Sequence, residues 1–180
     1  MSMCVHGEGV NFATVLSYAD DTKALQGIAN QADQINLQSD LGSLFSWADY
    51  NNNTFNVEKF ESITYSSYGI SHQYLDPEGN VIESKTHLRD LGVIMSNDAT
   101  FTRHINVIVS KGQKIAGWAL RVFHSREEEL MLTLYKSLIR HSLEYCSPLW
   151  FPKDQTNISA IEKVQRSFTK RVKGLEGLNY

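Results

Sequence analysis

The sequence predicts an α+β fold, with a strand-rich part over residues 1–97 and a helical part over residues 98–180. In the first part, short runs of β-branched and aromatic residues alternate with turn residues. In the second part, apolar residues recur three and four positions apart over three segments. The 180 residues suit one domain or two small subdomains.

A β-hairpin is the first predicted element. Residues 12–18 form its first strand, because they are rich in β-branched and aromatic side chains. Residues 22–28 return as the second strand. Ala19, Asp20 and Asp21 therefore occupy the turn, which places two neighbouring carboxylates at the tip of the hairpin.

A helix is predicted next, from about Asn30, a suitable N-cap, to about residue 48. We expect a strand over 54–66 with Lys59 near its start, and a hairpin over 72–82 around a turn at 76–80. A strand over 88–95 contains Gly92, which marks a bulge or a close backbone approach. The apolar face of the helix comprises Ile28, Ala32, Ile35, Leu37, Leu41, Leu44 and Ala48.

Three amphipathic helices are predicted in the second part. The first covers residues 103–123, and the second runs to about Glu144 after Ser125 and Glu128, which have the spacing of a capping box. Prolines at 148 and 152 interrupt the chain before the last helix, at about 157–173. One face of this last helix carries Lys163, Arg166, Lys170, Arg171 and Lys173.

Charge is divided unevenly along the chain. Residues 1–100 hold thirteen acidic and four basic residues, whereas residues 101–180 hold seven acidic and thirteen basic ones. This division predicts that the acidic part binds a cation and that the basic part binds a polyanion. The alternative is a solvated surface whose charge is merely uneven.

Composition and cysteine usage exclude several classes of protein. With 42% hydrophobic and 21% charged residues, the chain is neither wholly disordered nor fibrous. No apolar run approaches the roughly 18 residues of a membrane span, and we expect no secretory signal. Cys4 and Cys146 are too few and too distant for a disulfide framework, which favours a reducing compartment. The absence of a close Cys/His cluster argues against structural zinc.

The tetrapeptide Tyr18-Ala19-Asp20-Asp21 is the sharpest chemical feature. Adjacent carboxylates repel each other, and a divalent cation relieves that repulsion. Mg²⁺ prefers oxygen ligands, and two such ions can activate an attacking hydroxyl and stabilise the leaving oxygen of a phosphoryl transfer. An ordinary turn also contains such residues, so the pair alone leaves both interpretations open.

Five stretches along the chain, in this order and spacing, are typical of one family of polymerases. Together they resemble the reverse transcriptases of non-LTR retrotransposons of the jockey-like kind. The resemblance covers nearly the whole chain after the first ten residues. The stretches are SYADDTKAL at 17–25, FNVEKFESITYS at 55–66, LRDLGVIMSNDATFTRHI at 88–105, LYKSLIRHSLEYCSPLWFP at 134–152 and IEKVQRSFTKRV at 161–172.

The resemblance implies a partial polymerase palm of β-hairpins and a helix over 1–97, followed by a three-helix thumb over 98–180. It implies that Asp20 and Asp21 are catalytic ligands of Mg²⁺. Lys59 would protonate the leaving pyrophosphate, with a solvated strand lysine as the alternative. Tyr18 would lie close to the primer terminus.

The implied partners are an RNA template and a DNA primer. Leu91 and Gly92 would belong to the region beneath the primer end, with a simple core strand as the alternative. The basic residues of the last helix would contact phosphates without reading sequence. Tyr145, Trp150 and Phe151 are interpreted as core residues rather than as base-stacking groups.

The resemblance also implies parts that lie before the Tyr-Ala-Asp-Asp hairpin, namely a third carboxylate and the fingers. We therefore expect weak Mg²⁺ binding and no activity from this chain alone, and an amino-terminal polymerase region as a further partner. The expected location is intracellular, nuclear or cytoplasmic, without a membrane. The alternatives are a non-catalytic nucleic-acid-binding remnant, a decayed transposon reading frame, or a protein-interaction module that uses an exposed sheet edge.

Overall fold

The computed structural model describes residues 9–66 and 72–177 and confirms the α+β class. The chain divides into two compact units, residues 1–86 and residues 87–180. The boundary between the two parts that the sequence predicts, near residue 97, lies about ten residues after this division. The reason is that residues 87–96 form a hairpin whose second strand contacts the helix that follows it, over residues 102–122.

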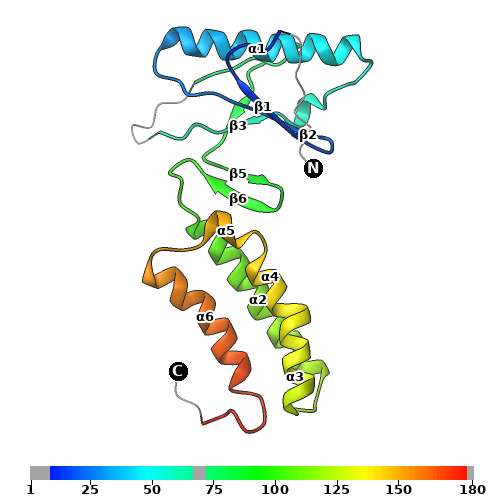
Figure 1. Cartoon of the computed structure of the whole chain (residues 1–180), viewed down its shortest axis with the longest axis vertical. Coiled ribbons are helices and arrows are strands. Elements are labelled where there is room, and N and C mark those ends of the chain that lie inside the picture. Colours follow the sequence, from blue (N-terminus) through cyan, green and yellow to red (C-terminus); the bar gives the residue numbers. More distant parts are fainter. Residues whose placement is uncertain (1–8, 67–71, 178–180) are drawn as a thin grey trace. The chain divides into compact units, whose positions relative to one another are not determined.

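The first unit combines a long helix with two short strand pairs (Figure 1). Strands β1 (Thr14–Tyr18) and β2 (Asp21–Leu25) are antiparallel, with Tyr18 opposite Asp21, so the predicted hairpin is confirmed. Strands β3 (Glu61–Ser62) and β4 (Glu83–Ser84) pair in parallel. Helix α1 covers Gln31–Tyr50.

Helix α1 begins at the predicted N-cap. The Asn30 side chain accepts hydrogen bonds from the backbone N–H groups of Ala32 and Asp33, and the Asp33 carboxylate accepts from the Asn30 N–H. The predicted apolar face is wrong at Ala32 and Ile35, which are exposed, because the face that packs inward is offset from them, and Ile28 lies before the helix begins. The buried residues of α1 are Leu37, Asp40, Leu44 and Ala48.

Residues 54–66 depart from the predicted strand. Lys59 lies in a 3₁₀ turn, η1 (Val57–Lys59), and only the two residues of β3 are extended. The turn forms because the Asn56 side chain accepts a hydrogen bond from the Glu58 N–H, which competes with strand pairing.

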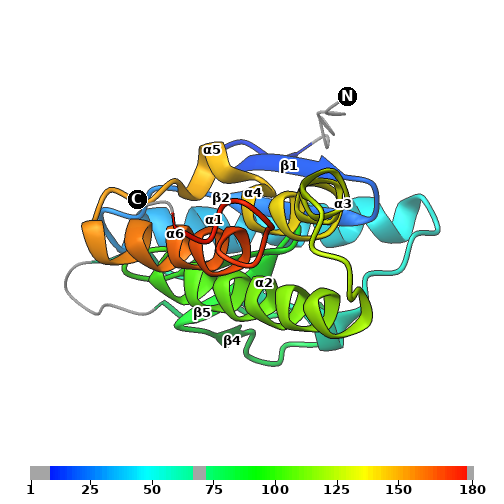
Figure 2. The same cartoon turned by 90° about the horizontal axis from the view of Figure 1, so that it is seen from below.

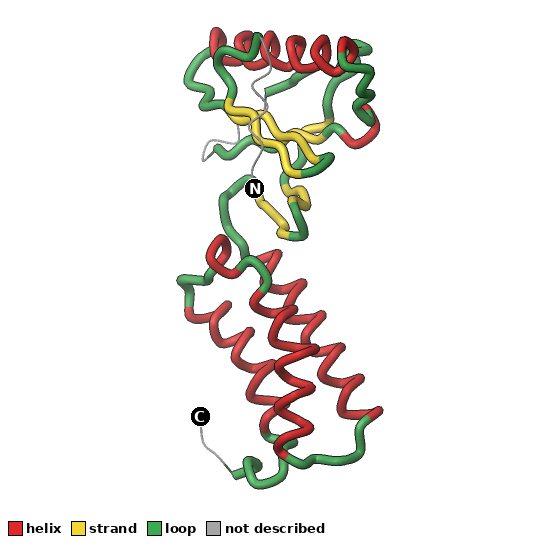
Figure 3. The backbone as a smooth tube through the Cα atoms, turned by 45° about the vertical axis from the view of Figure 1, so that its right-hand side comes forward, coloured by secondary structure: helices red, strands yellow, loops and turns green. Residues whose placement is uncertain are grey.

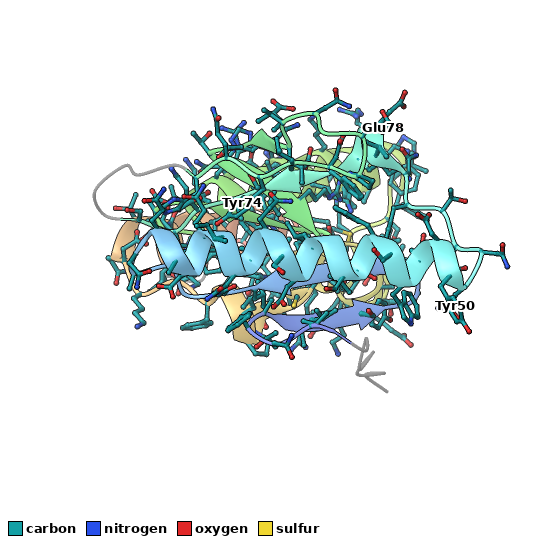
Figure 4. All side chains as sticks on the ribbon, turned by 90° about the horizontal axis from the view of Figure 1, so that it is seen from above. Tyr50, Tyr74 and Glu78 are labelled. Carbon is teal, nitrogen blue, oxygen red and sulfur yellow. The ribbon has the colours of Figure 1, made fainter. Side chains whose placement is uncertain are left out.

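The predicted hairpin over 72–82 is present in a reduced form, as a single bridge between Leu75 and Val81. The Asp76 carboxylate accepts hydrogen bonds from the N–H groups of Glu78 and Asn80, which shapes the turn. These hydrogen bonds lower the pKa of Asp76. Tyr74, which precedes the bridge at Leu75, is buried, whereas Tyr50 at the end of α1 projects outward (Figure 4).

The second unit is a hairpin followed by packed helices. Helix α2 contacts both α4 and α6, and the three lie side by side in two views (Figures 1 and 2). Figure 3 shows the short strands that precede them. The elements are β5 (His87–Asp90), β6 (Val93–Ser96), α2 (Thr102–Val122), α3 (Glu128–Leu134), the π-helical η2 (Tyr135–Arg140), α4 (His141–Glu144), α5 (Ser147–Trp150) and α6 (Gln155–Thr169).

The single strand predicted over 88–95 is wrong, because the chain reverses in its middle. Leu91 and Gly92 form a two-residue turn with φ of +43° and +88°, and Asp90 pairs with Val93 across it. Two consecutive positive φ values are what the tight turns of hairpins require, and glycine adopts them at little cost.

Two helix boundaries in the second unit also differ from prediction. Ser125 and Glu128 form no capping box: α3 begins at Glu128 without a side-chain cap, and the Ser125 hydroxyl accepts from the Glu127 N–H, at 3.4 Å. Helix α6 begins after Asp154, whose carboxylate accepts from the Asn157 N–H, and ends at Thr169.

A continuous apolar core joins the helices of the second unit. Helix α2 lies close to α4 and α6 at Gly112. A Cβ at this position would lie 2.9 Å from Leu143 Cδ2 and 3.3 Å from Val164 Cγ1. Across the described residues, no helix is both long and apolar enough to span a membrane. The buried core comprises Val93, Ile105, Ile108, Val109, Ala116, Ala119, Met131, Leu134, Ile139, Leu143, Trp150, Val164, Phe168 and Val172.

Candidate functional site

The β1–β2 turn carries the candidate metal ligands. Ala19 has a φ of +55°, the left-handed value that a two-residue hairpin turn needs at its first position. Asp20 is the second turn residue, and Asp21 is the first residue of β2, directly opposite Tyr18. All four residues are exposed, and Tyr18 is 62% exposed. The hairpin thus brings Tyr18, Asp20 and Asp21 together at one tip.

The two carboxylates are available as ligands. Within the described part of the chain, neither Asp20 nor Asp21 forms a side-chain hydrogen bond or an ion pair. Over residues 9–66 and 72–177, no three His, Cys, Asp or Glu side chains lie close enough together to hold a metal ion. Two exposed carboxylates are suitable oxygen donors for Mg²⁺, which commonly completes its shell with water and substrate phosphates.

A buried carboxylate on α1 fixes the approach to this hairpin. Asp40 is 1% exposed and accepts hydrogen bonds from three successive backbone N–H groups, those of Asn11 (3.0 Å), Phe12 (2.8 Å) and Ala13 (2.6 Å). These donors lie immediately before β1 and satisfy the buried charge. Sequence analysis missed Asp40, although it falls three residues after Leu37 and four before Leu44, within the buried stripe.

Lys59 does not join the carboxylates in any contact between described residues. It is exposed at the end of η1, without an ion pair among the described residues. The turn that carries it is flanked by Phe55 and Phe60, which pack against Phe45 of α1 with ring centroids 6.0 and 5.6 Å away.

The Leu91–Gly92 turn belongs to the other compact unit. The Tyr145 hydroxyl donates to the Leu91 carbonyl at 2.9 Å, and the Tyr145 ring lies over Gly92. The interpretation of Tyr145 and Phe151 as core residues is wrong, because they are exposed at 56% and 72%. It is confirmed for Trp150, which is buried.

The basic residues predicted on the last helix are only partly on it. Lys163 and Arg166 lie on α6, whereas Lys170, Arg171 and Lys173 follow its end. Arg166 pairs with Glu162 at 3.5 Å, and Lys173 pairs with Glu127 at 2.9 Å, which raises the pKa of Lys173. Pairing reduces the positive charge that these two residues offer to a polyanion.

Helix α2 has a second basic face that sequence analysis missed. Its 21 residues include no Asp or Glu. A shallow hollow on its outer side is lined by Asn106, Val107, Ser110, Lys111 and Lys114. Trp118 adds a 47% exposed indole to the same helix. Counting the Asp and Glu residues in each predicted helix would have identified this face. Its exposed cations, unpaired among the described residues, are Arg103, Lys111, Lys114 and Arg121.

Comparison with known proteins shows that the chain is distantly related to one polymerase of a mobile element. No protein-family model matches it, and no solved structure matches it significantly. Over 164 residues it is 24% identical to the RNA-directed DNA polymerase from mobile element jockey of Drosophila melanogaster. The match covers 89% of this chain and 18% of that polymerase, so the chain is distantly related to a small part of a non-LTR retrotransposon reverse transcriptase.

Proposed function

We propose that this chain corresponds to the palm and thumb portion of a non-LTR retrotransposon reverse transcriptase. In this role, residues 1–97 supply palm elements and residues 98–180 a thumb that holds an RNA template paired with a DNA primer. The observation that carries the proposal is the β1–β2 turn, which presents the exposed Asp20 and Asp21 beside Tyr18. The distant relationship to the jockey polymerase supports the same assignment.

Asp20 and Asp21 would hold Mg²⁺, which in the intact enzyme supplies charge stabilisation and activates the attacking 3′-hydroxyl. Tyr18 would contact the primer terminus, and Lys59 would donate a proton to pyrophosphate. Because Asp20 and Asp21 are the only carboxylates that meet at this turn among the described residues, we expect the chain alone to bind Mg²⁺ weakly and to extend no primer.

Metal binding is tested with Mn²⁺ as a paramagnetic probe in NMR spectra of the full chain. We expect Mn²⁺ to broaden the amide signals of residues 19–22 first, and Asp20→Asn together with Asp21→Asn to abolish that selectivity. Unchanged broadening in the double variant would contradict the assignment. Mg²⁺-dependent primer extension that Asp20→Ala abolishes would overturn the expected inactivity.

Nucleic-acid binding is tested by fluorescence anisotropy with an RNA–DNA hybrid. For roughly four phosphate contacts, affinity should fall about a hundredfold between about 50 and about 200 mM salt. Replacing Lys111 and Lys114 of α2 with Gln should lower the salt slope by about two. Replacing Lys163 and Lys170 with Gln measures how much the basic residues on and just after α6 contribute to the salt slope. Lys85→Gln, in the first unit, controls for the loss of a positive charge elsewhere in the chain. Salt-independent or absent binding would contradict the proposal.

The second candidate function is a non-catalytic nucleic-acid-binding remnant. The observation that favours it is that the acid-free face of α2 lies on a unit with its own core, separate from the carboxylate turn. Hybrid binding without selective Mn²⁺ broadening at residues 19–22 would favour this candidate over the first.

A further inference from the structure

Helix α2 has one exposed face that runs along its whole length. Residues seven and eleven positions apart lie on the same side of a helix, so Arg103, Lys114 and Arg121 follow one line along α2. All three are exposed, and the line is about 27 Å long at 1.5 Å per residue. The opposite side of α2 carries its buried residues and packs into the core of the second unit. The exposed face is therefore free of that packing.

The charge of this face is positive and uncompensated. None of the 21 residues of α2 is Asp or Glu, and Lys111 and Lys114 form no ion pair within the described part of the chain. In the same unit, by contrast, Arg166 and Lys173 are paired with glutamates. A row of unpaired cations without an intervening acid is complementary to a regularly charged polyanion.

A shallow hollow on this face adds neutral polar groups to the lysines. It is lined by Asn106, Val107, Ser110, Lys111 and Lys114. The side chains of Asn106 and Ser110 are exposed and form no hydrogen bond to another described residue. They are therefore available to donate to phosphate or sugar oxygens, which are common partners of such side chains in complexes with nucleic acids.

Trp118 distinguishes a nucleic acid from other polyanions. It lies on the same side of α2, one turn after Lys114, and is 47% exposed. Its indole packs in a T-shaped arrangement against Phe123, with ring centroids 6.2 Å apart, so the exposed ring is also supported. An aromatic ring within a row of cations is the arrangement on which unpaired bases stack. An acidic peptide without aromatic residues would leave this ring unused.

We propose that the exposed face of α2 is a binding site for single-stranded nucleic acid. Trp118 stacks on an unpaired base, and Lys111 and Lys114 contact the neighbouring phosphates. A single strand is the ligand because bases inside a duplex already stack on one another and do not offer their faces to the indole. The inference goes beyond the proposed function, since it concerns unpaired nucleic acid and uses no residue of the carboxylate turn.

The test measures binding of the full chain by fluorescence anisotropy at about 200 mM salt, where charge contributes less. The probes are a single strand of about 12 nucleotides, an RNA–DNA hybrid of the same length, and an abasic strand of the same length. Charge alone favours the hybrid, whose phosphates are denser. We expect the single strand to bind most tightly, and the abasic strand to bind at least about fivefold more weakly than it. An acidic peptide of equal charge should bind no better than the abasic strand.

Variants separate stacking from charge. Trp118→Leu should weaken single-strand affinity by about five- to a hundredfold at an unchanged salt slope, because it removes a ring and no charge. Trp118→Phe keeps an aromatic face and should recover part of the affinity. Replacing Lys111 and Lys114 with Gln should instead lower the salt slope by about 1.4. Phe151→Leu, which removes an exposed ring of the same unit outside α2, is the control and should change neither quantity.

Intrinsic fluorescence gives a direct readout of stacking. The tryptophans of the chain are Trp47, Trp118 and Trp150, and Trp150 is buried. A saturating single strand should quench the emission of the wild-type chain and leave the remaining emission of Trp118→Leu unchanged. A merely structural role of Trp118 would produce no such difference.

The outcomes separate this inference from the proposed function. If the hybrid binds as tightly as the single strand, or if Trp118→Leu binds like Phe151→Leu, the single-strand site is overturned and the proposed function stands. If the acidic peptide binds as tightly as the single strand, the face is a protein-docking surface and the inference fails. If the single strand binds as expected and the hybrid shows no salt-dependent affinity, the proposed function fails and the inference holds.

Discussion

The two compact units are stabilised by different kinds of contact. The second unit has fourteen buried apolar residues in one cluster, whereas the buried apolar residues of the first are Val15, Leu37, Leu44, Ala48 and Tyr74 among those described. The first unit relies instead on side chains of α1 that bind backbone groups, above all Asp40. The geometry of the β1–β2 turn therefore depends on hydrogen bonds from the backbone to buried or half-buried side chains of α1. The basic face of α2 depends instead on the apolar core of the second unit.

The largest expected effect breaks the second unit at its core. Phe168 is 1% exposed and packs against Tyr135, with ring centroids 5.9 Å apart. Phe168→Ala should destabilise this unit by about 3–5 kcal/mol through lost burial and a cavity. Hydrogen exchange should rise throughout α2 and α6 while the amides of α1 keep their rates. Equal acceleration in both units would contradict independent cores.

The next largest effect breaks the first unit at its polar anchor. Asp40→Ala leaves three N–H groups without their acceptor and should destabilise the unit by about 3 kcal/mol. Asp40→Asn keeps one acceptor oxygen and should lose less. The measurement is hydrogen exchange of Val15 and Ala24 in the hairpin, with α2 as an internal reference. Unchanged hairpin exchange in Asp40→Ala would show that the anchor is dispensable.

A smaller effect is expected at the second anchor of α1. Gln38 accepts from the Leu75 N–H at 2.8 Å and donates to the Leu75 carbonyl at 3.1 Å, as a neighbouring strand would. Gln38→Ala should cost about 1 kcal/mol, because water can replace partners at an exposed site. Thermal unfolding followed by circular dichroism measures this change. Gln38→Glu, which keeps an acceptor but no donor, should fall between the variant and the wild type.

The smallest expected effect is a pH dependence confined to the second unit. Burial, with a lesser contribution from the positive charge of Arg89, lowers the pKa of His104. The unfolded chain then binds a proton more readily than the folded one, so stability is complete above about pH 6.5 and declines as the pH falls below it. Melting temperatures across this range should show the decline in the wild type.

Replacement of His104 by Phe should flatten this pH dependence, since the ring keeps its packing against Trp150 and no longer titrates. His141→Gln, at an exposed position, is the control and should leave the profile unchanged. A profile that is equally steep in His104→Phe would show that another group is responsible.

Local sequence signals were sufficient where one pattern dominates. The β1–β2 hairpin, the Asn30 cap and the amphipathic face of α2 follow from strand composition, a short polar cap and a spacing of three and four. Each of these depends on neighbours along the chain. The tip that presents Asp20 and Asp21 was therefore predictable.

The remaining features depend on residues distant in sequence. The chain reverses at Leu91 and Gly92 where Tyr145, more than fifty positions later, supports the turn. Asp40 can be buried because three backbone N–H groups that precede β1 donate hydrogen bonds to it. Its position within an apolar stripe of the sequence does not indicate these distant donors. By itself, the sequence determined the elements and the carboxylate tip. Tertiary structure decided which polar groups are buried, since a buried charge persists only where the fold supplies its donors.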